Sequence, residues 1–195
     1  MKFVNAMAGS LLLAVVPLAA HSEDMSYSYV ELGYVDADLG NVASGDGPSL
    51  RGSVGFAENF FVFGEYTTLG FPAGIDLDQY TVGLGGRLGI SDNMDLVGRV
   101  GYTEFDLSVP GFGSGNADGY VVSAGIRGQV AEDFELEGHV IHTDLGSDLG
   151  DSTALVVGGR YFFTKSFAIG AEYRTGDEIA GEDLDLISAH VRFAF

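Results

Sequence analysis

The chain has 195 residues, of which 28 are acidic and only 9 are basic, so its formal net charge is −19. Such an acidic chain is a poor partner for nucleic acid, whose phosphates are bound by Lys and Arg. Cysteine is absent, which excludes disulfides and thiol chemistry, and the length suits a single domain.

Residues 1–22 are predicted to be a secretory signal peptide. Lys2 supplies the positive start, and LLLAVVPLAA (residues 11–20) is an apolar run too short to span a bilayer. Ala20-His21-Ser22 then offers a small-x-small cleavage site, with cleavage predicted after Ser22 and after Ala20 as the alternative. We therefore expect an exported protein whose mature part, residues 23–195, forms one domain.

The mature chain alternates between apolar and polar residues in ten successive runs. Period-two alternation predicts β-strands, and a run of about ten residues is long enough for a tilted strand to cross a bilayer. The predicted strands lie near residues 26–35, 48–57, 60–69, 78–90, 94–105, 119–130, 134–143, 153–163, 167–175 and 184–195.

The connections between these runs alternate between short and long. Tight turns are expected at residues 57–59, 91–93, 131–133 and 164–166. Longer loops rich in Gly and Asp are expected at residues 36–47, 70–77, 106–118, 144–152 and 176–183. Short turns on one side and long loops on the other are typical of a barrel in the outer membrane.

All seven arginines of the mature chain, with several Glu and His residues, share one parity of the runs, and the apolar residues share the other. In the first run Val30, Leu32 and Tyr34 form the apolar side, opposite Glu31. Because an Arg in the middle of a lipid-facing strand costs about 2–4 kcal/mol, the charged parity is predicted to face the lumen and to form ion pairs there. The lumen candidates are Glu31, Arg51, Glu65, Arg87, Arg99, Arg127, Glu135, Glu137, His139, Arg160, Glu172, Arg174, His190 and Arg192.

The aromatic residues on the apolar parity are sorted by the end of the strand. Tyrosines adjoin the longer loops, whereas phenylalanines adjoin the tight turns or the C-terminus. This predicts two aromatic girdles, one at each membrane interface. Their members are Tyr34, Tyr66, Tyr80, Tyr102, Tyr120 and Tyr173 at one end, and Phe56, Phe60, Phe134, Phe163, Phe167 and Phe195 at the other.

Four stretches carry a resemblance to a known family: MSYSYVELGYV, LRGSVGFAENFFVFGEY, LDQYTVGLGGRLG and NMDLVGRVGYTEFD. With them the chain resembles the small outer-membrane β-barrel proteins of Gram-negative bacteria, the OmpA/OmpX-like superfamily, and most closely the xanthomonad-type barrels. The resemblance implies a place in the bacterial outer membrane, among its lipid and lipopolysaccharide.

The C-terminal stretch SAHVRFAF, residues 188–195, resembles the assembly signal of this family. Ala189, Val191, Phe193 and Phe195 would carry the signal, which the assembly machinery of the outer membrane reads. The fold expected from pattern and resemblance together is all-β, a single antiparallel transmembrane barrel of ten strands, with eight strands as the alternative.

The acidic loops offer a second kind of candidate site. Asp144, Asp148 and Asp151 lie in one loop, and Asp177, Glu178, Glu182, Asp183 and Asp185 lie in or beside another. Oxygen-rich segments can hold divalent cations, which would bridge these carboxylates to lipopolysaccharide phosphates, although an ordinary solvated acidic surface is the simpler interpretation. The loops contain no motif that names a ligand.

Three functions are consistent with the sequence. The first is a non-enzymatic structural or surface-interaction barrel with an ion-paired lumen, without cofactor or resident metal. The second is a small porin-like channel for ions or small solutes. The third is an outer-membrane hydrolase, for which Ser188, His190 and Glu172 could supply nucleophile, base and orienting acid, or His142 and Asp144 a rim site.

Overall fold

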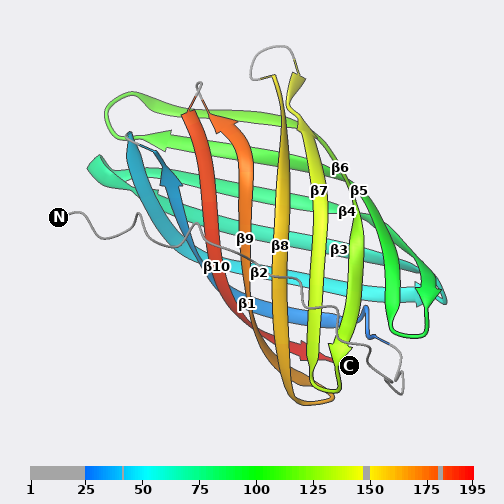
Figure 1. Ribbon diagram of the computed structural model, residues 1–195. Helices are drawn as coiled ribbons and strands as arrows, with labels where there is room; N and C mark the ends of the chain where they lie inside the picture. Colours follow the sequence, from blue (N-terminus) through cyan, green and yellow to red (C-terminus); the bar gives the residue numbers. More distant parts are fainter. Residues whose placement is uncertain (1–24, 41, 147–149, 180–181) are drawn as a thin grey trace.

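The computed structural model describes residues 25–195, apart from 41, 147–149 and 180–181. The predicted signal peptide lies outside the described residues. Ten antiparallel strands form a closed barrel (Figure 1), which confirms the ten-stranded prediction, and the eight-stranded alternative is wrong. The strands are β1 (Tyr29–Leu39), β2 (Ala43–Ala57), β3 (Phe60–Phe71), β4 (Ile75–Ser91), β5 (Met94–Val109), β6 (Gly113–Ala131), β7 (Phe134–Asp144), β8 (Asp151–Thr164), β9 (Phe167–Ile179) and β10 (Glu182–Ala194).

Each strand pairs with its neighbours in sequence, and β10 closes the barrel against β1. Glu31 lies opposite Arg192 across this closing seam, where the red and blue ends of the chain run side by side in Figure 1. Closure pairs the strand edges, which is the condition that lets a sheet stand in lipid. Among the described residues no helix is long and apolar enough to cross a membrane.

The two ends of the barrel differ in their connections. At the short-turn end, two-residue turns at 58–59, 92–93, 132–133 and 165–166 join the strands, and Phe195 donates its backbone N–H to Ser28. At the opposite, hairpin end, the connections fall at residues 40–42, 72–74, 110–112, 145–150 and 180–181. Pro72–Gly74 forms a single 3₁₀ turn, η1.

The prediction of long loops at the hairpin end is wrong. Most of their residues continue the strands; β5 runs to Val109 and β6 resumes at Gly113, so only three residues of the predicted 106–118 loop lie between strands. Glycine makes such tight connections feasible, because Gly40 and Gly111 adopt positive φ values of 57° and 81°. Asp and Gly therefore marked strand extensions as well as turns.

Within these extensions the chemical pattern of the strands inverts, so that apolar residues point inward and acidic residues point outward. On the membrane part of β10, Ile187 points outward and His190 points inward, whereas nearer the hairpin end Asp183 points outward and Leu184 inward. An apolar cluster consequently occupies part of the barrel interior at this end: Val35, Ala37, Leu69 and Leu184, with Leu39, Phe71, Leu77 and Leu186 packed around it. The hairpin end is thus built like a soluble barrel, with its apolar side chains inside.

Candidate functional site

The lumen at mid-height holds a network of ion pairs. All seven arginines of residues 25–195 point inward, and each has a carboxylate within 4.0 Å. Within the described part of the chain, seven carboxylates pair with them: Glu31, Glu65, Asp95, Glu135, Glu137, Glu172 and Asp177. Charges buried this deeply are tolerated only when paired and hydrogen-bonded.

Arg160 on β8 is the centre of the network. Its side chain is 2% exposed, and its guanidinium lies 2.6 Å from Glu135 Oε1 and 3.3 Å from Glu172 Oε1. It also donates to Glu137 and lies 3.8 Å from Glu31. One guanidinium thereby meets carboxylates from β1, β7 and β9, which ties opposite walls of the barrel together.

Glu31 on β1 is the complementary acidic centre. Arg192 Nε donates to its Oε2 at 2.6 Å, and Arg51 Nη1 lies 3.3 Å from its Oε1. Arg51 also donates to Glu172 at 2.8 Å. The strand register explains these pairs, because β1 lies between β10 and β2 with Glu31 directly opposite Arg192 and Arg51.

Further pairs extend the central network toward the two ends of the lumen. Arg127 makes two hydrogen bonds of 2.8 Å to Glu135, in the fork geometry that suits a carboxylate. Arg174 donates to Asp177 at 2.5 Å near the hairpin end. Together with the central network these contacts bring the predicted lumen residues together, although His190 makes no hydrogen bond with a described residue.

Aromatic side chains fill the lumen at the short-turn end. Tyr27, from the segment before β1, stacks on Phe61 with 5.1 Å between ring centroids and donates its hydroxyl to Asp95 at 2.8 Å. The guanidinium of Arg127 lies 4.5 Å from the Tyr27 ring centroid. The N-terminal segment therefore enters the barrel as part of its filling.

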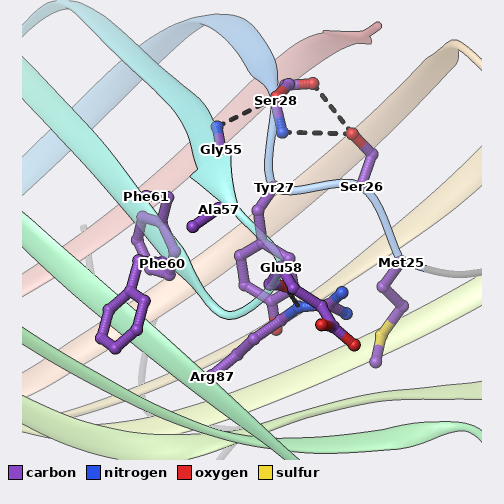
Figure 2. A pocket seen from close by; sticks show the side chains of 10 residues that line it. All are labelled: Met25, Ser26, Tyr27, Ser28, Gly55, Ala57, Glu58, Phe60, Phe61 and Arg87. Carbon is purple, nitrogen blue, oxygen red and sulfur yellow. Dashed lines mark hydrogen bonds between the residues drawn. The ribbon is translucent and has the colours of Figure 1, made fainter.

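A pocket opens beside this aromatic filling (Figure 2). Its lining includes Tyr27, Phe61, Glu58 and Arg87, whose Nε donates to the Glu58 carbonyl at 3.1 Å. Along its upper edge the Ser26 hydroxyl donates a hydrogen bond to the Ser28 carbonyl and accepts one from the Ser28 backbone N–H. The pocket thus lies at the mouth of the barrel between the N-terminal segment and the β2–β3 turn.

The residues named for a hydrolase do not form a catalytic arrangement. Ser188 and His190 share the inner face of β10, but neither ring nitrogen of His190 has a hydrogen-bond partner among the described residues. Glu172 is engaged by Arg51 and Arg160. A nucleophile needs a hydrogen-bonded base to be activated, and no such contact joins these three side chains. At the rim, His142 Nδ1 lies 3.0 Å from Thr153 Oγ1 instead of contacting Asp144.

Glu31, Glu172 and His190 come close enough to suggest a metal site, since one ligand atom from each lies within 4.8 Å of the others. Three arginines already lie within 3.8 Å of Glu31. A divalent cation at this point would meet three guanidinium charges at close range. These surroundings do not fit a metal ion.

The predicted girdle residues all point away from the lumen and are exposed or half-buried. Three of the tyrosines donate to an Asp on the next strand: Tyr34 to Asp46, Tyr66 to Asp78 at 2.9 Å, and Tyr120 to Asp144 at 2.7 Å. Each tyrosine ring thereby covers part of the apolar outer surface, while its hydroxyl group reaches the polar surface nearer the hairpin end. The assembly-signal residues Ala189, Val191, Phe193 and Phe195 also point outward.

An acidic belt surrounds the barrel on the hairpin side of the tyrosines. It contains no Lys or Arg, and several of its members are placed directly opposite each other on adjacent strands. The belt consists of Asp36, Asp38, Asp46, Asp76, Asp78, Glu104, Asp106, Asp118, Asp144, Asp151, Asp183 and Asp185. These carboxylates lie on strands, whereas most of them were predicted in loops; only Asp78, Glu104 and Asp185 were predicted within strands. Asp148 lies outside the described residues.

Sequence reasoning missed two lumen carboxylates and one aromatic. Asp95 shares the inward parity of Arg99 on β5, so alternation alone could have found it. Asp177 lies beyond a register shift between β9 and β10, which turns it inward against the expected parity. Tyr161 points outward and packs edge-on against Phe163, with 5.1 Å between the ring centroids. Its parity, which is that of Phe163, could have identified it as an outward aromatic residue.

Sequence comparison decides the family. The family model described as "Outer membrane protein beta-barrel domain" matches residues 8–154. The chain belongs to this family. The protein is therefore located in the bacterial outer membrane, as the resemblance implied. Its apolar outer surface faces lipid. No curated protein matches the sequence.

Solved structures resemble this outer-membrane barrel in fold. An outer membrane channel from Pseudomonas putida F1 has a TM-score of 0.58 at 8% identity, over 92% of this chain and 100% of that one. The NanC porin has a TM-score of 0.48 at 11% identity, over 86% and 100% of the two chains. Ail, the attachment invasion locus protein of Yersinia pestis, has a TM-score of 0.42 at 16% identity, over 88% and 100%. At these identities the likeness concerns the fold alone.

Proposed function

We propose that this protein is a non-enzymatic outer-membrane barrel with a lumen closed to ion flow, which acts as a structural or surface-interaction protein through its acidic hairpin end. The observation that carries the proposal is the ion-pair network across the lumen. Arg160 alone contacts four carboxylates from three strands. Dense paired charge blocks a narrow lumen, whereas segregated acidic and basic walls would leave a path.

The network lies between two further fillings. The aromatic cluster of Tyr27, Phe61, Phe63 and Val97 occupies the short-turn end. The apolar cluster around Leu69 and Leu184 occupies part of the hairpin end. Because short turns of such barrels face the periplasm, the acidic hairpin end would face the outside of the cell and be available to partners.

Lipopolysaccharide is the partner that the acidic belt would meet first. The belt lies immediately beyond the tyrosine girdle, at the level where lipid phosphates begin. Direct contact between carboxylates and phosphates is repulsive, so divalent cations are needed between them. The assembly machinery would recognise the outward C-terminal residues before the barrel is inserted.

A small channel is the second candidate, and one observation favours it. The inner face of β6 is partly exposed from Ala117 to Gly125, whereas the inner residues of β10 from Ser188 to Ala194 are buried. Solvent therefore reaches into the lumen along one wall. This path leads toward the network at mid-height.

Single-channel recording of the mature protein in a planar bilayer tests the proposal. We expect insertion without current steps, while a heat-dependent gel shift of the same sample shows that the barrel is folded. A Tyr27→Ala/Phe61→Ala variant removes the aromatic filling and serves as a positive comparison. Steady current steps from the unmodified protein would overturn the closed lumen and favour the channel.

A further inference from the structure

Arg99 and Glu65 form the most exposed ion pair of the central lumen. Their charged atoms lie 3.6 Å apart, and their side chains are 22% and 35% exposed. Arg99 makes no hydrogen bond to another residue in the described part of the chain, whereas the central Arg160 makes several. The guanidinium therefore has donors that only water or a ligand can use.

The surroundings hold Arg99 in place. Its guanidinium lies 5.6 Å from the Phe63 ring centroid and 5.9 Å from that of Phe61. Both rings are buried, so they form a rigid support on one side of the cation. His139 on β7 shares the inner face and lies across β6 from Arg99, with their register partners Gly125 and Ser123 two residues apart, and its imidazole makes no hydrogen bond within the described ranges.

Solvent reaches this position along β6. Ala117, Gly119, Val121, Ser123 and Gly125 line its inner face, and all are small and partly exposed. Ser123 is the register partner of Arg99 on β5, and Gly125 is the partner of His139 on β7. These partly exposed residues mark the solvent-accessible wall of the lumen, which runs from the hairpin end to the level of Arg99 and His139.

We propose that Arg99 and Glu65, with His139, form a binding site for a small zwitterion of the amino-acid type. The ligand's carboxylate replaces Glu65 on Arg99, where the planar guanidinium offers two parallel donors. Its ammonium group takes the carboxylate of Glu65. The site goes beyond the proposed closed barrel and does not depend on it, because binding from outside requires no flow through the lumen.

The charge balance selects a zwitterion over a simple ion. The central lumen contains five arginines and five glutamates, so it is neutral before binding: Arg51, Arg99, Arg127, Arg160 and Arg192 against Glu31, Glu65, Glu135, Glu137 and Glu172. A carboxylate or an ammonium ion alone would bring one uncompensated charge into a partly dehydrated space. A ligand with both groups replaces the Arg99–Glu65 ion pair by two ion pairs, one with Arg99 and one with Glu65.

The test is a titration of the mature barrel in detergent micelles, with isotope-labelled Arg and His followed by NMR. Alanine is the zwitterion, and propionate and ethylammonium carry its two charges separately. We expect alanine to shift the Arg99 and His139 signals saturably, with a dissociation constant in the roughly millimolar range, and the single ions to bind at least about tenfold more weakly.

Matched variants locate the site. Arg99→Gln should abolish the saturable shift of His139, whereas Arg87→Gln should preserve it, because Arg87 pairs with Asp95 at 3.5 Å and lies nearer the short-turn end, on the far side of the Tyr27–Phe61 stack. Ser123→Leu, which leaves the charges intact, should block the approach if Arg99→Gln does not fold. Equal binding of propionate and alanine, or no saturable shift with alanine, would overturn the proposal.

Discussion

At the scale of single residues, the decisive feature is how each buried charge is compensated. Arg160 and Glu31 are 2% and 1% exposed, yet each meets several opposite charges. The pairs are a condition for burying the charges, and removing one partner leaves the others without compensation. The network therefore fixes the lumen most firmly where one side chain serves several strands.

Replacing Arg160 by Gln should destabilise the barrel by about 3–5 kcal/mol, because Glu135, Glu137 and Glu172 remain buried with less compensation. Urea unfolding in detergent, followed by far-ultraviolet circular dichroism, measures the loss. Arg87→Gln is the matched control and should cost no more than about 1 kcal/mol, since its single ion pair is long and Asp95 keeps its hydrogen bond from Tyr27. Equal losses in the two variants would contradict the central role of Arg160.

Sequence alternation predicted much of this site and stopped at identifiable places. All seven arginines were placed inside by parity, because the cost of exposing Arg to lipid leaves no other choice. Which carboxylate each would meet depends on the stagger between strands far apart in the chain, as for Arg51 and Glu172. Asp177 was missed because a register shift reverses the parity there.

At the scale of elements, the strands are longer than the membrane requires, and their pattern reverses past the tyrosines. On β1, Leu32 faces outward and Glu31 inward, but farther along Asp36 faces outward and Val35 and Ala37 face inward. Side chains still alternate between the two faces, but the apolar residues now lie on the inner face instead of the outer one. Predicting long loops was wrong because an inverted pattern rich in Asp and Gly resembles a loop by composition.

Close packing between strands gives the second prediction. A Cβ added to Gly85 on β4 would lie 2.1 Å from the nearest atom of the Phe61 ring. Gly85→Ala should displace the buried ring and cost about 1–3 kcal/mol. Gly98→Ala on β5 is the control, because its Cβ would point outward and lie 3.9 Å from the nearest atom, a Ser123 carbonyl oxygen. A stability loss in Gly98→Ala as large as in Gly85→Ala would contradict the role of the close Gly85–Phe61 contact, because backbone entropy alone makes Gly→Ala stabilising.

At the scale of the whole molecule, charge is segregated by surface. Every arginine of residues 25–195 is inside, and the outer belt at the hairpin end is acidic throughout. Five pairs of carboxylates lie directly opposite each other on adjacent strands: Asp36 and Asp46, Asp38 and Asp185, Asp78 and Asp106, Glu104 and Asp118, and Asp144 and Asp151. Like charges in this arrangement destabilise a sheet by about 0.2–1 kcal/mol per pair.

Divalent cations should therefore stabilise the assembled barrel, and most strongly where phosphates surround the belt. We expect Mg²⁺ to raise the unfolding temperature in vesicles containing lipopolysaccharide more than in phosphatidylcholine vesicles, and a chelator to reverse the gain. Relief of the five pairs corresponds to about 1–5 kcal/mol in total. Asp78→Asn/Asp106→Asn removes one pair and should reduce the response to Mg²⁺, whereas NaCl of equal ionic strength controls for general screening. A response to Mg²⁺ no larger than that to NaCl in both membranes would show that the belt is only a solvated acidic surface.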